Sequence, residues 1–312
     1  MTDFHFSTSR PDHWESLCDE SGALFSSGAW LDLLERSFKC RTFYASNENQ
    51  GFAVTVFRGG PFRIGYLGFP VGGGVGRVVA TGNIVEALKA ADFSGKPICV
   101  RIPVSAFESD AQLELSCQSN PETVIENLQD WSLGSVSKNL RRDVRKAERS
   151  ELIISEETDP EVGCKLFDIY AQTVKQHGGS IRYREKYFQE LIKLSKVNSR
   201  LKVLIATQNN EIAGFSVVAR HEHVACYLHG GATPKYRKSS PSDLLLNHAI
   251  HHAQREGSLR FSLMASPPDQ PSLVRYKEKW GGVTRDLDTY TAVLSTKFYL
   301  FRVAELIYRL TV

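Results

Sequence analysis

Three short apolar runs follow one another in the second half of the chain: Leu201-Lys-Val-Leu-Ile-Ala-Thr, Glu211-Ile-Ala-Gly-Phe-Ser-Val-Val-Ala and His223-Val-Ala-Cys-Tyr-Leu-His. Each run has the length of a strand and the β-branched and aromatic residues that strands favour. Gln208-Asn-Asn separates the first two runs and favours a tight turn. The stretch therefore predicts three consecutive strands in an antiparallel meander.

Amphipathic segments flank the meander on both sides. Residues 138–149 and 162–174 place apolar side chains at helical spacing before it, and residues 243–255 do so after it. Gly257 ends the later helix, and the apolar residues 259–264 predict one more strand. The resulting order of helices, strands, helix and strand indicates a mixed α/β domain.

The first part of the chain has the same coarse order of helix before strand. Residues 30–37 have helical spacing, whereas residues 52–57 and 98–104 are β-rich runs. Between these runs, the glycines and the proline of residues 65–76 favour a loop. Residues 121–128 begin with a proline, which the first turn of a helix tolerates, so we expect a helix there.

The length of the chain predicts more than one domain. A chain of 312 residues exceeds what a single hydrophobic core usually organises. We expect an N-terminal domain over residues 1–136, a C-terminal domain over residues 137–295 and a separate C-terminal helix over residues 296–312. The predicted fold class is α/β with mixed sheets.

The charge balance and the cysteines exclude several classes of protein. The 38 Lys and Arg residues against 35 Asp and Glu give a net charge of only +3, so an anionic partner would meet a local patch. The six cysteines lack the paired spacing of zinc or redox motifs, and we expect reduced thiols and no metal site. The sequence shows neither a signal-like start nor an apolar run of about 18 residues, which predicts a cytoplasmic protein without a transmembrane segment.

Four segments of the second half occur in a distinctive order. They are the basic segment 139–148, Gln176-His-Gly-Gly with Tyr187-Phe-Gln-Glu-Leu, Leu228-His-Gly-Gly-Ala followed by Ser239-Ser-Pro-Ser-Asp-Leu-Leu, and Val274-Arg-Tyr-Lys-Glu-Lys-Trp-Gly-Gly. In this order they resemble the Fem-type family of peptidoglycan-bridge aminoacyltransferases, a branch of the GNAT superfamily. The resemblance implies two GNAT-like domains in tandem, with the C-terminal helix packing back on the first domain.

The resemblance also implies a reaction. Members of the Fem-type family and related enzymes transfer an acyl or aminoacyl group from an activated ester to an amine of a cell-wall or glycan precursor. The resemblance therefore implies aminoacyl-tRNA or acyl-CoA as a donor co-substrate and no permanently bound cofactor. The glycine-rich loop that cradles the CoA pyrophosphate in many GNAT enzymes is replaced here by Tyr236-Arg-Lys-Ser-Ser-Pro-Ser, which favours aminoacyl-tRNA. The alternatives are an acetyl-CoA-dependent N-acetyltransferase of polysaccharide or lipid biosynthesis and a non-catalytic module that binds RNA or a nucleotide sugar.

The predicted helix over residues 138–149 carries a positive face. Arg141 and Arg145 lie one turn apart on this face, with Arg142 beside them. Guanidinium groups bind phosphate oxygens in a forked geometry, so the face is a candidate site for the diphosphate of a nucleotide- or lipid-linked glycan precursor. A solvated basic face explains the same pattern.

Lys277 matches the lysine of the family's terminal aromatic-Lys motif. The resemblance implies a catalytic role, because a cation near the reacting carbonyl stabilises the oxyanion that forms there. Tyr276 and Lys279 flank Lys277 and are assigned to substrate binding. An exposed loop with scattered charges, and a tyrosine packed in the core, would have the same sequence.

Arg237, Lys238, Ser239 and Ser240 precede the helix that begins near Asp243. Unpaired backbone amides and the positive end of the helix dipole attract anions, so these four residues form a candidate site for the phosphates of the donor. Capping of the helix by Ser240 or Ser242 accounts for the same spacing.

We expect direct transfer, in which the acceptor amine attacks the acyl carbonyl without an enzyme nucleophile. Asp243, Asp269, Glu278 and the substrate itself are the candidates for removing the proton of the amine. The apolar residues of the last helix suit packing on the first domain, self-association or peripheral contact with a membrane.

Overall fold

The computed structural model of the protein describes residues 4–76, 81–91, 95–107 and 115–311. The chain divides into two compact units, the first formed by residues 1–119 with 287–312 and the second by residues 120–286. The sequence placed the divisions after residues 136 and 295. In the structure each division falls inside a strand, because β7 (Ser116–Ile125) and β13 (Val283–Val293) each run from one unit into the other.

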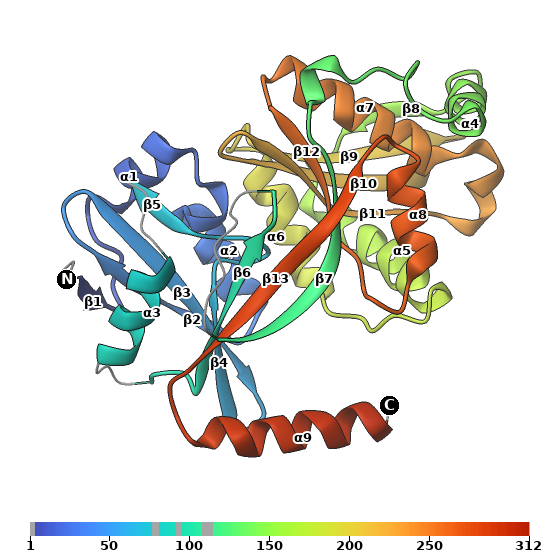
Figure 1. The fold of residues 1–312 in the computed structure, drawn as a ribbon. Helices are drawn as coiled ribbons and strands as arrows, with labels where there is room; N and C mark the ends of the chain where they lie inside the picture. The colour runs from blue at the N-terminus through green and yellow to red at the C-terminus, as the bar shows by residue number, and fades with distance from the viewer. Residues whose placement is uncertain (1–3, 77–80, 92–94, 108–114, 312) are drawn as a thin grey trace. The chain divides into compact units, whose positions relative to one another are not determined.

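The first unit is a mixed sheet with helices (Figure 1). Strands β1 to β4 pair in sequence order and antiparallel, β4 pairs parallel with β6, β6 pairs antiparallel with β13, and the short β5 pairs with β3. The described elements are β1 (His5–Ser7), α1 (Trp14–Ser21), η1 (Leu24–Ser26), α2 (Gly28–Ser37), β2 (Cys40–Ser46), β3 (Gln50–Gly59), β4 (Phe62–Leu67), β5 (Gly74–Gly76), α3 (Thr81–Ala90), β6 (Cys99–Ser105), β13 and α9 (Lys297–Thr311).

Two apolar clusters pack on opposite faces of this sheet, since neighbouring residues of a strand point to opposite sides. One cluster joins Val54 and Val100 of the sheet to Leu88 of α3. The other includes Cys99 of the sheet and Phe298 of α9. An ion pair of 3.2 Å between Arg101 and Glu305 joins β6 to α9 as well. The C-terminal helix is thus part of the first unit.

The second unit has the same kind of sheet. Strands β8 to β11 pair in sequence order and antiparallel, β11 pairs parallel with β12, and β12 pairs antiparallel with β7. The remaining described elements are η2 (Leu128–Asp130), α4 (Lys138–Glu148), β8 (Ile153–Glu156), η3 (Pro160–Val162), α5 (Gly163–Gln176), α6 (Glu185–Ser195), β9 (Leu201–Gln208), β10 (Glu211–His221), β11 (Val224–Ala232), η4 (Pro234–Ser239), α7 (Pro241–Arg255), β12 (Arg260–Ala265) and α8 (Pro271–Glu278).

The two units therefore repeat one topology. Each has four antiparallel strands, a helix that leads to a parallel fifth strand, and an antiparallel sixth strand. The sixth strand is exchanged between the two halves of the sequence. β7 follows the first unit's β6 but completes the second sheet, and β13 follows the second unit's α8 but completes the first sheet.

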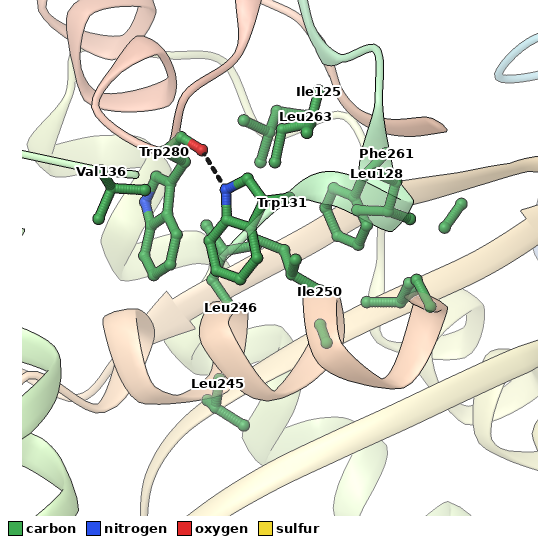
Figure 2. Close-up of a cluster of buried hydrophobic side chains, with 14 of the residues drawn as sticks. Ile125, Leu128, Trp131, Val136, Leu245, Leu246, Ile250, Phe261, Leu263 and Trp280 are labelled. Carbon is green, nitrogen blue, oxygen red and sulfur yellow. Dashed lines mark hydrogen bonds between the residues drawn. The ribbon is translucent and has the colours of Figure 1, made fainter. Parts of the chain in front are cut away.

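The core of the second unit is built on α7 and two tryptophans. Figure 2 shows Trp131 and Trp280 side by side over α7, with Leu246 and Ile250 on that helix. The indole rings stack with centroids 6.4 Å apart, and Trp131 Nε1 donates to the Trp280 carbonyl oxygen at 2.8 Å. The bond fixes the backbone directly after α8.

Two predictions about local structure are wrong. Residues 121–128 do not form a helix, because residues 121–125 belong to β7 and Thr123-Val124-Ile125 is a β-branched run that pairs with β12. Residues 65–76 are not all loop, since β4 continues to Leu67 and residues 74–76 form β5. The predicted meander, in contrast, is found as β9, β10 and β11.

Candidate active site

Lys277 is the only buried side chain of α8 in the described chain, with 7% of its surface exposed. Its Nζ donates to the main-chain oxygens of Met264 at 2.7 Å and Ala265 at 3.3 Å. Met264 has a φ of 63°, a left-handed conformation that costs energy for a residue with a side chain. The register of β12 against β7 shifts between Ser262 and Ala265, so the lysine binds the carbonyls of an irregular strand end.

Glu122 of β7 belongs to the same buried environment. Its side chain is 3% exposed and accepts a hydrogen bond of 2.8 Å from Ser262 Oγ. Burial lowers the pKa of Lys277 to about 7, although the charge of Glu122 opposes the shift. Near neutral pH the lysine is therefore poised between its charged and neutral forms.

Asp243 of α7 lies in a second cluster of ionisable groups. Tyr276 Oη donates to Asp243 Oδ1 at 2.9 Å. Burial raises the pKa of Asp243, the charge of Asp143 raises it further, and the Tyr276 bond and the charge of Lys279 oppose the shift. A carboxylate with a raised pKa is a better proton acceptor near neutral pH than an exposed one.

The hydroxyl of Tyr227 is close to this cluster. Burial and then the charge of Asp243 raise the pKa of Tyr227. Its hydroxyl lies against the backbone of Gly230, where even a Cβ would collide with it. Glycine at this position therefore leaves room for the tyrosine. The other two candidate bases differ, because Asp269 and Glu278 are exposed.

An aromatic cluster surrounds His229 at the end of β11. The ring shares a hydrogen bond of 3.1 Å with Tyr187 Oη, and the rings of Tyr170, Tyr183 and Phe188 lie within 4.5 to 6.0 Å of it, centroid to centroid. Burial lowers the pKa of His229 to about 3, so the ring is neutral. Two segments that the sequence singled out separately, at residues 187–191 and 228–232, thus meet in the structure.

The predicted donor-binding segment forms η4 and the start of α7. Arg237 is hydrogen-bonded to Gln176, and Ser239 Oγ donates to Gln208 at 3.2 Å. Ser240 precedes α7 with a φ of 53°, and its side chain makes no capping hydrogen bond. Capping by Ser240, the simpler interpretation of the sequence, is therefore wrong. Lys238 is exposed beside these residues.

The α5–α6 turn lies close to the segment before α8. Gln270 Nε2 donates to the carbonyl oxygen of His177 at 3.2 Å. Since Gln176 of the same turn holds Arg237, this turn contacts both η4 and the residue that precedes α8. The Gln176-His-Gly-Gly segment therefore contacts the predicted donor-binding segment and the residue that precedes α8.

The basic residues of α4 are placed differently. Leu140, Val144 and Ala147 bury one face of the helix, which packs on α7, whereas Arg142 and Arg145 are exposed on the other side. The ammonium of Lys277 points to β12, and in the described part of the chain no hydrogen bond or ion pair joins it to α4. Arg141 Nη1 donates to the carbonyl oxygen of Gly134 at 3.3 Å, and Arg142 lies 3.7 Å from Asp143.

A family comparison covers most of the second unit, including Asp243, His229 and Lys277 but not Glu122, Trp131, Lys279 or Trp280. Residues 134–278 match the model of the acetyltransferase (GNAT) domain. The matched residues span most of the second unit, residues 120–286. The match includes α4, η4, the start of α7 and Lys277. A comparison of the sequence with curated proteins gives no match.

Solved structures extend the GNAT similarity over the whole chain. FemX is 10% identical and aligns over 95% of this chain and 99% of its own, with a TM-score of 0.69. L-PGS from Bacillus licheniformis is 16% identical over 96% and 97%, with a TM-score of 0.58. A tandem GNAT protein from the clavulanic acid biosynthesis pathway is 12% identical over 94% and 99%, with a TM-score of 0.51. The predicted fold, two GNAT-like domains in tandem, is confirmed.

Within the second unit, strands β11 and β12 separate after a short parallel pairing. They pair only from Val224 to Cys226 and from Arg260 to Ser262, although β11 continues to Ala232 and β12 to Ala265. β11 also has a bulge at Leu228, opposite the junction of Val217 and Val218 in β10. Tyr227 and His229 flank this bulge, while Lys277 binds the diverging end of β12. The divergence leaves backbone groups of both strands outside the ladder.

Sequence reasoning missed Glu122 because it placed residues 121–128 in a helix. The β-branched run beside Glu122 was the available signal, and an acidic residue in such a run is unusual enough to suggest a partner. In the described ranges, no group of three or more His, Cys, Asp or Glu side chains could hold a metal ion. None of the described helices combines the length and apolar character needed to cross a bilayer.

Proposed function

We propose that this protein is an acyltransferase that moves an acyl or aminoacyl group from an activated ester to an amine of a nucleotide- or lipid-linked glycan precursor. The match of residues 134–278 to the GNAT acetyltransferase domain carries the proposal. The buried Lys277, with a pKa near 7 at the diverging end of β12, supports it, because near-neutral ionisable groups in such positions are typical of active sites.

The proposed reaction is a direct displacement. The acceptor amine attacks the acyl carbonyl, a C–N bond forms, and the C–O bond of the ester or the C–S bond of a thioester breaks. Charged Lys277 stabilises the oxyanion of the tetrahedral intermediate. Asp243 takes the amine proton, because its raised pKa suits that step, and the proton then passes to the leaving group.

The remaining predicted residues receive binding roles in this proposal. Exposed guanidinium groups on α4 bind the acceptor's phosphates, and η4 with the start of α7 binds those of the donor. The residues in question are Arg141, Arg142 and Arg145 on α4, Tyr276 and Lys279 beside Lys277, and Arg237, Lys238, Ser239 and Ser240 before α7.

The donor is proposed to be an aminoacyl-tRNA, with acyl-CoA as the alternative, and both donors place the reaction in the cytoplasm. The stretch from Tyr236 to Ser242, in η4 and the first turn of α7, has no glycine. Equilibrium titration with charged tRNA and with acetyl-CoA separates the two, since only the true donor should bind tightly. If charged tRNA or a nucleotide sugar binds but no transfer occurs, the chain is a binding module.

Lys277→Met tests the catalytic role. Loss of an oxyanion-stabilising group typically lowers kcat by about 100- to 1,000-fold, and we expect this loss with a KM changed only a few-fold. Arg275→Gln is the matched control, because Arg275 is an exposed cation on the same helix. Transfer from charged tRNA or acetyl-CoA to an amine-bearing UDP-linked glycan precursor is measured. A Lys277→Met enzyme within about threefold of wild type contradicts the proposal.

A peripheral membrane contact is a second proposal, favoured by α9. Tyr299, Leu300 and Val303 are 65%, 67% and 57% exposed on this helix. Exposed aromatic and aliphatic side chains on an amphipathic helix suit the interface of a bilayer. Co-flotation with anionic vesicles measures the contact, and Leu300→Glu should weaken it. Equal flotation of both proteins, or none, counts against it.

A further inference from the structure

A pocket of about 410 Å³ opens on the first unit, outside the GNAT match. Four of its eight described lining residues are cations, and none is acidic. The cations are Lys39 and Arg41 of the α2–β2 region, Arg58 of β3 and Arg63 of β4, and all four are exposed. Phe43 and Val56 are buried and form the apolar floor.

The sheet holds these four cations close together. Arg58 lies directly opposite Arg63 in the β3–β4 pairing, and Arg41 lies opposite Val56, two residues before Arg58. Paired residues have Cβ atoms about 5 Å apart and diagonal neighbours about 7 to 8 Å apart. Arg58 N also donates to the Lys39 carbonyl oxygen at 3.2 Å, which fixes the fourth position.

The elements around the pocket do not neutralise it. The C-terminal end of α3 would bring negative partial charge, but Lys96 Nζ donates to the carbonyl oxygens of Lys89 and Ala91 there. The nearby carboxylate of Glu35 accepts from the Thr42 amide at 2.6 Å. No ion pair joins any of the four lining cations to a carboxylate of the described chain.

The wall of the pocket leaves space for a ligand. Gly95 lines it with a φ of 89°, and a Cβ at Gly95 would come within 3.5 Å of both Arg63 and Phe43. The glycine thus keeps the loop close to the cations without filling the space between them.

We propose that this pocket binds a diphosphate group. Guanidinium forks bind phosphoryl oxygens in pairs, and three arginines converge here. A phosphate monoester carries about −1.5 to −2 at pH 7 and would balance only about half of the four positive charges. A diphosphate adds a second phosphoryl group and more negative charge within the same small space. The group is carried by a nucleoside diphosphate or by a prenyl diphosphate, which share this chemistry.

The inference goes beyond the proposed transfer reaction, because none of the lining residues was assigned a role in it. Binding is measured without any turnover. The proposed pocket can therefore be ruled out without ruling out the acyltransferase activity, and the activity can be ruled out without ruling out the pocket.

The test is calorimetric titration of the full chain at low ionic strength with inorganic pyrophosphate, inorganic phosphate, UDP and geranyl diphosphate. We expect pyrophosphate to bind more tightly than phosphate and added salt to weaken binding. Arg58→Gln with Arg63→Gln should weaken it by about tenfold or more, since each removes charge-assisted hydrogen bonds. Lys165→Gln with Lys196→Gln removes the same charge from exposed positions of the second unit and should leave binding unchanged.

The sources of the diphosphate are separated by the same titrations. Tighter binding of UDP than of pyrophosphate identifies a nucleotide, and tighter binding of geranyl diphosphate identifies a lipid; both support the site. The proposal is overturned if the wild type binds no diphosphate, or if both double variants lose binding equally. It is also overturned if a short RNA duplex binds through Arg58 and Arg63 while the diphosphates do not. Thermal denaturation of each variant verifies that it is folded.

Discussion

Lys277 couples protonation to folding at the scale of a single residue. Burial lowers its pKa to about 7, against about 10.4 for a lysine in an unfolded chain. Between these values the unfolded chain holds a proton that the folded chain lacks, so stability rises with pH. Below about pH 7 both states are protonated and the cost of the buried charge is present in full. The slope expected from this residue is about 1.4 kcal/mol per pH unit.

The prediction is read from the difference between wild type and Lys277→Met. Urea unfolding between about pH 7.5 and 9.5 should show the wild type gaining stability relative to the variant as pH rises. Lys279→Met is the control, because Lys279 is exposed two residues away and its removal should leave the slope unchanged. If the free energy of unfolding changes with pH in the same way in wild type and Lys277→Met, the prediction is wrong, and water reaches the Lys277 ammonium in the folded protein.

His229 makes a contribution of the same sign at acid pH, because its lowered pKa also makes stability rise with pH. Burial lowers its pKa to about 3, whereas an unfolded histidine titrates near 6.5. As pH falls through 6.5 the unfolded chain gains a proton that the folded chain rejects, so stability is lost down to about pH 3. His229→Phe should remove about 1 to 2 kcal/mol of the loss between pH 7 and 5. Urea unfolding at each pH measures the free energy of unfolding of both proteins. If that free energy falls as steeply between pH 7 and 5 in the variant as in the wild type, the prediction is wrong.

At the scale of elements, the position of helix α8 depends on a hydrogen bond directly after its C-terminal end. Trp280 is fully buried, and its carbonyl accepts the indole N–H of Trp131. Trp131→Phe should lower the free energy of unfolding by about 1 to 3 kcal/mol, because a buried acceptor loses its donor. It should also lower the rate of transfer, since the backbone after α8 positions Lys277.

Trp14→Phe is the matched control for that prediction. Trp14 Nε1 donates to the Ser26 carbonyl oxygen at 2.8 Å in the first unit. This variant should lose similar stability in thermal denaturation without a comparable loss of transfer rate. Equal rates of transfer in Trp131→Phe and wild type would show that the Trp131–Trp280 hydrogen bond does not position Lys277.

Elements with a clear period were predictable, and elements set by long-range pairing were not. The meander and α7 follow from their apolar spacing and their turn residues. β7 was taken for a helix because Pro121 suits a first turn, while its strand conformation comes from pairing with β12, more than 130 residues later in the chain. The sequence likewise did not predict the burial of Lys277, because its charged neighbours Glu278 and Lys279 suggest an exposed segment.

The exchange of β7 and β13 decides the order of assembly at the scale of the whole molecule. Residues 120–286 contain β8 to β12 and the part of β7 that pairs with β12, whereas the first unit needs residues 287–312 from the other end of the chain. Without them, β6 loses its β13 partner from Cys99 to Ser105, and Ile64 and Cys99 lose Phe298. The sequence predicted two domains but not this insertion of one unit into the other, because pairing between distant segments leaves no local signal.

The insertion predicts that the first unit folds once its two pieces are joined. Ser119 Oγ donates to Asp288 Oδ1 at 2.5 Å, so the cut ends lie close enough for a short Gly/Ser linker. Residues 1–119 linked to 287–312 should therefore give a cooperative thermal transition, whereas residues 1–119 alone should aggregate through the exposed edge of β6. Residues 120–286 should fold alone. Size-exclusion chromatography measures the solubility of each fragment, and circular dichroism measures the cooperativity of its thermal unfolding. If residues 1–119 alone are as soluble and unfold as cooperatively as the joined protein, β13 and α9 are not required for the first unit to fold.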